Sequence, residues 1–206
     1  MSGEGDTDDD AQRAIGEDEN VLVRIASGEQ AALARLIDRH GHGLRVFAAR
    51  YLGSAADAED VVQDVFVSVW KHAARFDPVK GRASTWLYRI TANRCIDARR
   101  RRSLRAFIGL DDVHDILADE DPRADARVGA RQELAIVRDG LARLPERQRM
   151  ALLLRAVAGL DVPAIAEVMG ASAGSVEQLL VRGRRSLRGH LTTVQHTNEG
   201  HEGTSR

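Results

Sequence analysis

Residues 55–73 read AADAEDVVQDVFVSVWKHA, and this stretch decides the fold class. Its apolar side chains recur at the spacing of one helix face, namely Ala58, Val61, Val62, Val65, Phe66, Val69 and Trp70. The opposite face is polar and carries Glu59, Asp60, Gln63, Asp64 and Lys71. Asp57 precedes the stripe, at a place where a carboxylate favours the helix dipole. The stretch therefore predicts an amphipathic helix that buries one face in a helical core.

The same periodicity on both sides of this stretch predicts a helical domain over residues 21–102. Ala31–Tyr51 shows it, although His40-Gly41-His42-Gly43 in its middle is poor helix material. Ser84 or Thr85 can cap a last helix that reaches Arg102. The expected helices cover residues 21–26, 31–51, 55–73 and 85–102.

Periodicity returns near Arg131 and predicts a second helical domain over residues 131–191. Its expected helices cover residues 131–144, 152–157, 163–169 and 172–191. Residues 103–130 lose the pattern and gain glycine, aspartate and proline, as is typical of a linker. Residues 1–20 and 192–206 are expected to be disordered. The predicted fold class is all-α, with two small helical domains joined by a flexible acidic linker.

The net charge of −1 conceals a strong segregation of charge along the chain. Residues 1–20 carry −7, residues 21–102 carry +7, residues 103–130 carry −4 and residues 131–190 carry +4. Two basic domains separated by acidic segments indicate binding to a polyanion at two places. No apolar run is long enough to span a membrane, no secretory signal is expected, and a single cysteine excludes a disulfide framework. We expect a cytoplasmic protein without a cofactor.

Residues 163–185 carry the strongest local signal. Ala166, Gly170 and Val176 have the spacing of a helix-turn-helix, in which glycine takes the left-handed conformation of the tight turn. Ser172 is a suitable N-cap for the second helix, and four arginines between residues 182 and 188 make its end basic. The alternative is an ordinary helical hairpin with a solvated basic face. The glycine and the clustered arginines favour DNA.

A second basic constellation occupies residues 85–102. Thr85, Trp86 and Tyr88 stand at its start, and Arg89, Arg94 and the run at 99–102 follow. Aromatic rings beside arginines suit single-stranded nucleic acid, because bases stack on the rings while the arginines neutralise the backbone. The alternative is that Trp86 belongs to the core and the arginines form a solvated helix end.

The acidic stripe of Asp57, Asp60, Gln63 and Asp64 is a third constellation. Paired carboxylates could serve acid–base chemistry or Mg²⁺, but no nearby histidine, serine or glycine-rich loop completes an active site. The stripe is a solvated face or, in the sharper interpretation, a docking surface for a basic partner helix. Cys95 could be a redox sensor, but its helical spacing favours a small buried hydrophobe. No catalytic or metal-ligating residue is predicted.

Four strings, in this order and spacing, resemble bacterial RNA polymerase sigma factors of the extracytoplasmic-function (ECF) class, group IV of the sigma-70 family. They are DAEDVVQDVF at 57–66, TWLYRITAN at 85–93, LPERQR at 144–149, and IAEVMG followed by SAGSV at 165–176. The resemblance spans about Val21 to Leu191. It implies a transcription initiation factor and not an enzyme. The implied partners are core RNA polymerase (the β′ clamp helices and the β flap), promoter DNA and an anti-sigma factor.

The resemblance also implies a role for each constellation. The first domain would bind the clamp helices through Asp57, Asp60, Gln63 and Asp64. Its last helix would melt the −10 promoter element through Thr85, Trp86, Arg89, Asn93, Arg94, Asp97 and Arg100. The second domain would read the −35 element in the major groove through Ser172, Ser175, Glu177, Gln178, Arg182 and Arg185.

The chain departs from the family at Glu177-Gln178-Leu179, where a basic residue, serine and arginine are usual. Glutamate can accept a hydrogen bond from cytosine N4 and glutamine can pair with adenine, so a different −35 preference is expected. A stand-alone helix-turn-helix regulator would explain residues 131–190 but would leave the other two constellations without a role. A nucleic-acid enzyme would need a metal or nucleophile cluster. The acidic residues 1–20 are expected to shield the basic surface of residues 21–102.

Overall fold

The computed structural model of the chain describes residues 5–107 and 128–202, and all regular structure in these ranges is helical. The first group of helices comprises α1 (Gly5–Ala26), α2 (Gln30–Leu52), α3 (Ala55–His72), the short η1 (Ala73–Arg75) and α4 (Ala83–Phe107). The second group comprises α5 (Val128–Arg143), α6 (Glu146–Ala156), α7 (Val162–Met169) and α8 (Ala173–Glu202). The predicted all-α fold of two helical domains is confirmed, while most of the expected linker lies outside the described residues.

The first domain packs α2, α3 and α4 around an apolar core, with α1 lying against α2 and α4. The stripe predicted on residues 55–73 faces this core except at Trp70, which remains 38% exposed. The Ser54 hydroxyl caps α3 by accepting a hydrogen bond from the Asp57 amide at 3.1 Å. Asp57 thus lies in the first turn, where its negative charge interacts favourably with the positive end of the helix dipole, as the sequence predicts.

The second domain contains the predicted helix-turn-helix, formed by α7 and α8, packed on α6. The Asp161 carboxylate caps α7 by accepting from the Ala164 amide at 2.9 Å. Gly170 ends α7 with φ of 56°, a left-handed conformation that costs glycine little. The side chains that fill the space between the helices are buried, as expected: Ile165, Val168, Val176 and Leu180.

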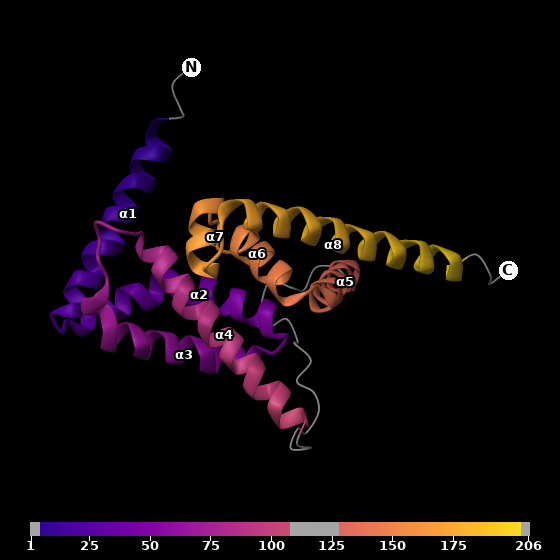
Figure 1. Cartoon of the computed structure of the whole chain (residues 1–206), viewed down its shortest axis with the longest axis horizontal. Coiled ribbons are helices and arrows are strands. Elements are labelled where there is room, and N and C mark those ends of the chain that lie inside the picture. The colour runs from indigo at the N-terminus through magenta and orange to yellow at the C-terminus, as the bar shows by residue number, and fades with distance from the viewer. Residues whose placement is uncertain (1–4, 108–127, 203–206) are drawn as a thin grey trace.

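The two domains touch where α7 lies against α4 and α6 against α2 (Figure 1). The Tyr51 hydroxyl of α2 donates a hydrogen bond to the Glu146 carboxylate of α6 at 2.7 Å. Burial, and then this hydrogen bond, raise the pKa of Tyr51, so the hydroxyl stays protonated and remains a donor. Arg149 is buried and donates to the Tyr51 backbone carbonyl at 3.2 Å. The string LPERQR at 144–149 therefore joins the domains.

Several boundaries differ from the prediction. α1 begins at Gly5, inside the segment expected to be disordered, and α8 continues past Leu191 to Glu202. α6 begins at Glu146 rather than near Leu152, because the Pro145 carbonyl already accepts from the Arg149 amide and starts the helix.

The α2 helix passes through the two glycines at 41 and 43 without a break. A Cβ atom at Gly43 would lie 3.1 Å from the Tyr88 hydroxyl, and one at Gly41 would lie 3.8 Å from the Phe66 ring. Gly43 therefore serves the close packing of α2 on α4, whereas a Cβ atom at Gly41 would make only an ordinary van der Waals contact. Packing of this kind outweighs a low helix propensity.

Candidate functional site

One face of α4 exposes some of the residues that are predicted to bind the −10 element, here called the −10 set. Asn93, Asp97 and Arg100 are exposed and follow one another at helical spacing. Trp86 lies about two turns before Asn93 and is half-buried, with its ring 5.6 Å from the Phe76 ring at an angle of 55°. The indole is thus both packed and partly accessible, so the two alternatives for Trp86 are not exclusive.

Three other residues predicted to bind the −10 element are less accessible. Thr85 is only 3% exposed, so its side chain cannot reach a base in this conformation. Arg89 is half-buried and forms an ion pair with Glu167 of α7 at 3.5 Å. The second domain therefore neutralises one arginine of α4 in this arrangement. Arg94 is half-buried as well.

The start of α8 carries the residues that are predicted to bind the −35 element. The Ser172 hydroxyl accepts from the Ser175 amide at 3.2 Å, which confirms that Ser172 caps the helix. A shallow hollow of about 420 Å³ on the exposed side is lined by Glu177, Gln178, Val181 and Arg182. Arg185, one turn further on, is exposed.

Val181 is a member of this surface that the sequence reasoning missed. It is 64% exposed, although an apolar residue in an amphipathic helix is expected to face the core. Its neighbours Leu179 and Leu180 are buried, and this register turns Val181 outward between Gln178 and Arg182. Reading the helix register from buried Val176 would have found it.

The acidic stripe of α3 borders an apolar groove. Asp60, Gln63 and Asp64 are exposed as expected, whereas Asp57 lies 3.6 Å from Arg102 of α4. The groove has a volume of about 940 Å³ and runs between α2 and α3. Its apolar lining includes Leu33, Ile37, Val62, Phe66, Val67 and Trp70, and its polar lining includes Asp38, Glu59 and Gln63. The apolar part of this surface was also missed, because Trp70 was assigned to the core.

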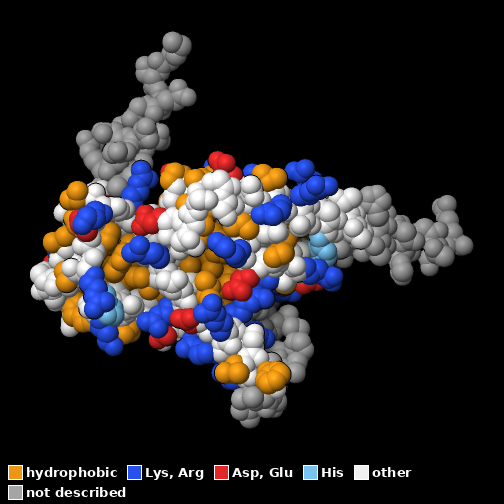
Figure 2. Space-filling model, in the orientation of Figure 1, with side chains coloured by type: hydrophobic (Ala, Val, Ile, Leu, Met, Phe, Trp, Pro, Cys, Tyr) orange, Lys and Arg blue, Asp and Glu red, His pale blue; other side chains and the backbone are white. Residues whose placement is uncertain are grey.

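Figure 2 shows basic side chains distributed over one face of the molecule, along α8 and around α4, with apolar side chains at the tip of α4. Leu104 and Phe107 form that tip and are exposed. The acidic side chains on this face are fewer and lie among the basic ones. A surface of this kind suits the phosphate backbone of nucleic acid.

Cys95 is buried in the first domain, and burial raises the pKa of its thiol to about 12. A neutral, enclosed thiol reacts slowly with oxidants, so this position does not support a redox sensor. In the described part of the chain, no group of three or more His, Cys, Asp or Glu side chains is placed to hold a metal ion. No described helix has the length and apolar character needed to cross a membrane.

The comparisons with known proteins follow this division into domains. Residues 36–105 match the family model of Sigma-70 region 2, and residues 134–187 match that of Sigma-70, region 4. The chain is 35% identical over 180 residues to the RNA polymerase sigma factor NccH of Alcaligenes xylosoxydans xylosoxydans, covering 86% of this chain and 96% of NccH. It is 32% identical over 201 residues to the ECF RNA polymerase sigma factor SigE of Mycolicibacterium smegmatis, covering 94% of this chain and 75% of SigE.

A solved structure, CnrH in complex with the cytosolic domain of CnrY, is similar over both domains. The TM-score is 0.66 and the identity 31%, with 86% of this chain and 98% of CnrH covered. The basic helix α4 lies in the part that matches region 2, and the helix-turn-helix lies in the part that matches region 4. Together they define a protein that directs RNA polymerase to promoters. The chain belongs to the extracytoplasmic-function class of sigma-70 family sigma factors.

Membership in this family establishes the activity. Sigma factors bind core RNA polymerase and promoter DNA and initiate transcription, and they are not enzymes. The predicted family and the predicted function as a sigma factor are thereby confirmed. A stand-alone helix-turn-helix regulator does not account for the region 2 match over residues 36–105.

Proposed function

We propose that α4 opens the −10 element and that α8 reads the −35 element of the promoter. The observation that carries the first part is the exposed face of α4, which aligns Trp86, Asn93 and Arg100. Extruding a base costs on the order of a few kcal/mol of stacking and pairing, so each unpaired base must be held. Stacking on Trp86, hydrogen bonds to Asn93 and neutralisation by Arg100 supply these interactions.

The second part rests on the hollow at the start of α8. A helix of this kind enters the major groove, where every base pair has a distinct pattern of donors and acceptors. Glu177 accepts from cytosine N4, Gln178 pairs with adenine, and Val181 offers an apolar contact to a thymine methyl group. Arg182 and Arg185 neutralise the flanking phosphates.

We propose that the groove between α2 and α3 docks a helix of the polymerase clamp. Its floor is apolar, and its polar lining is of mixed charge, because Arg45 pairs with Glu59 at 3.5 Å. The negative charge that favours an amphipathic helix with basic flanks comes from Asp60 and Asp64 on the neighbouring face of α3. The exposed Asp60, Gln63 and Asp64 then meet the basic side of that helix. Replacing Asp64 by lysine should weaken the affinity for core polymerase more at low salt than at high salt.

We further propose that an anti-sigma factor controls the protein, in the cytoplasm and in response to stress. CnrH is known in complex with the cytosolic domain of CnrY, and CnrH is similar to this chain over both domains. The contact of α7 with α4, including the pair Arg89–Glu167, covers part of the α4 face in the present arrangement. A partner that stabilises this arrangement would keep α4 from single-stranded DNA.

Run-off transcription with core polymerase on a randomised promoter library tests the proposed function. We expect selection of both a −35 and a −10 sequence. Glu177→Ala should change the −35 preference and leave the −10 preference unchanged, while Trp86→Ala should lower open-complex yield. A −35 preference that is the same for Glu177→Ala and the parent would refute direct reading by Glu177.

A further inference from the structure

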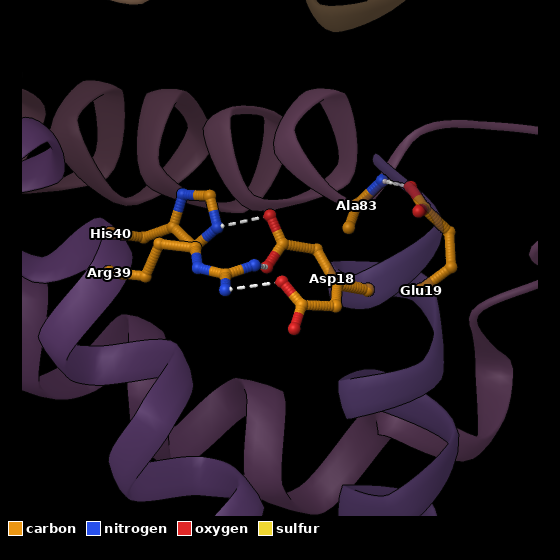
Figure 3. A network of polar contacts seen from close by, with 6 residues as sticks. Asp18, Glu19, Arg39, His40 and Ala83 are labelled. Atoms are coloured by element: carbon orange, nitrogen blue, oxygen red, sulfur yellow. Dashed lines mark hydrogen bonds and ion pairs between the residues drawn. The ribbon is translucent and has the colours of Figure 1, made fainter. Parts of the chain in front are cut away.

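The N-terminus of α4 takes its cap from a distant part of the chain. Oε1 of Glu19, in α1, accepts a hydrogen bond from the Ala83 amide at 2.8 Å (Figure 3). Ala83 is the first residue of α4 and is 1% exposed, so water cannot easily replace this acceptor. A buried amide without a partner destabilises the helix end that carries it.

The sequence next to α4 offers no substitute for Glu19. A local cap stands just before the first helical residue, and there the chain has Gly81 and Arg82, neither of which has an acceptor side chain. Ser84 and Thr85, which the sequence suggested as caps, already lie inside the first turn. The carboxylate of Glu19 therefore satisfies the amide and also places negative charge at the positive end of the helix dipole.

Glu19 is itself held firmly in place. The neighbouring Asp18 carboxylate accepts from Arg39 of α2 at 2.6 Å and lies 2.8 Å from Nε2 of His40. Figure 3 shows these side chains converging on α1 from α2, on the side opposite the bond from Glu19 to Ala83. On the next turns of α1, Leu22 and Ile25 are buried in the core. α1 thus connects α2 rigidly to the start of α4.

The second oxygen of Glu19, Oε2, is buried and has no hydrogen-bond partner among the described residues. Burying a carboxylate oxygen in this way costs free energy. Among the described residues, the Glu19 carboxylate therefore interacts with the N-terminus of α4 and not with an arginine. The Asp18 carboxylate, in contrast, pairs with Arg39.

We propose that Glu19 is a positioning residue for promoter opening. The first turn of α4 contains Trp86, whose ring packs on Phe76 from the segment before the helix. When the Ala83 amide loses its acceptor, this turn frays and must reorder before Trp86 can hold an unpaired base. The inference rests on the proposed role of α4 at the −10 element, and it assigns to α1 a part in that role.

The test compares two promoters with the full-length chain and core polymerase. One promoter is fully duplex, and the other carries a mismatched, pre-opened −10 region. For Glu19→Ala we expect open-complex formation on the duplex promoter to slow about five-fold, the size of one lost helix cap. On the pre-opened promoter the defect should shrink to less than about two-fold, because the first turn no longer has to compete with base pairing.

Two further variants make the result specific. Glu17→Ala is the matched control, because it removes an acid from the same helix. Glu17 is exposed and, among the described residues, pairs only with Arg39. This variant should leave the rate of open-complex formation unchanged on both promoters. Glu19→Gln keeps an acceptor oxygen but removes the charge, so it should give a smaller defect than Glu19→Ala and provides a second test if Glu19→Ala folds poorly. Affinity for core polymerase should stay the same in all three.

An equal defect on both promoters, or no defect for both Glu19 variants, would overturn the inference. The proposed role of α4 is checked separately by Trp86→Ala. If Trp86→Ala opens the duplex promoter as fast as the parent, the proposed function fails. If Trp86→Ala is slow while both Glu19 variants are normal, only the role of Glu19 fails.

Discussion

Arg149 is the side chain whose replacement should damage the fold most specifically. It is buried at the junction of the two domains, and its guanidinium donates to three buried carbonyls, those of Leu141 (2.8 Å), Leu144 (3.1 Å) and Tyr51 (3.2 Å). A fourth bond, which is only partly buried, goes to the Ala142 carbonyl at 2.5 Å. Arg149→Met keeps most of the apolar stem and removes every one of these donors. The change therefore removes the hydrogen bonds, and with them the contact of the guanidinium with the Tyr51 ring at 5.9 Å from its centroid, while most of the apolar packing stays.

The expected loss follows from these contacts. Hydrogen bonds from a charged donor to buried acceptors contribute about 1.5 kcal/mol each, or about 4.5 kcal/mol for the three buried ones. Two terms reduce this figure. The Leu141 carbonyl keeps a second donor in the Leu144 amide at 3.2 Å, and burial lowers the pKa of Arg149, which shows that desolvating the guanidinium opposes folding. We expect a net loss of about 2–3 kcal/mol in the free energy of unfolding.

Urea denaturation of the full chain, followed by circular dichroism, measures this loss. Arg147→Met is the matched control, because Arg147 lies on the same helix, is exposed and should change stability by less than about 0.5 kcal/mol. If Arg149→Met and Arg147→Met have the same midpoint, the hydrogen bonds of Arg149 do not stabilise the fold and the reasoning is refuted.

Three further predictions concern the turn, the thiol and the N-terminus. Gly170→Ala should lower stability by about 1 kcal/mol, because Gly170 has a left-handed φ of 56°. Gly174→Ala should raise stability, because Gly174 is exposed in a helix with open space around it. Thermal unfolding distinguishes the two variants, and equal shifts in Tm would contradict the left-handed assignment of Gly170. The pKa of Cys95 is raised to about 12, so its contribution to stability is complete below the ordinary thiol pKa near 9 and is lost as pH rises towards 12. At pH 8 iodoacetamide should modify Cys95 only as the chain unfolds, and rapid modification of the folded chain would refute burial. Deleting residues 1–16, which keeps Glu17 to Glu19, should raise DNA affinity at low salt if the acidic end shields basic surface, and an unchanged affinity would exclude shielding by that segment.

The helices and the helix-turn-helix could be predicted from the sequence because their signals are local. The stripe on residues 55–73, the cap Ser172, the first-turn acid Asp57 and the turn residue Gly170 each act within one or two turns. The exposed position of Glu177 and Gln178 follows from the turn that precedes them, while their role at the −35 element stays a prediction.

The features that could not be predicted depend on contacts between distant segments. Glu19 caps a helix 64 residues further on, and Glu146 meets Tyr51 across 95 residues. Helix propensity also misled at Gly41 and Gly43, and at Gly43 the close approach of Tyr88 that favours glycine comes from another helix. Trp70 follows the apolar stripe of α3, but no described helix covers it, so periodicity alone assigned it to the core.

Site-specific photocrosslinking of the polymerase complex on promoter DNA tests most directly whether the two domains divide promoter recognition. A photoreactive residue placed at Asn93 should crosslink to the unpaired strand of the −10 element, and one at Gln178 should crosslink to duplex DNA about two helical turns upstream. Crosslinks from both positions to the same DNA segment, or none from Asn93 once the DNA is open, would contradict the account.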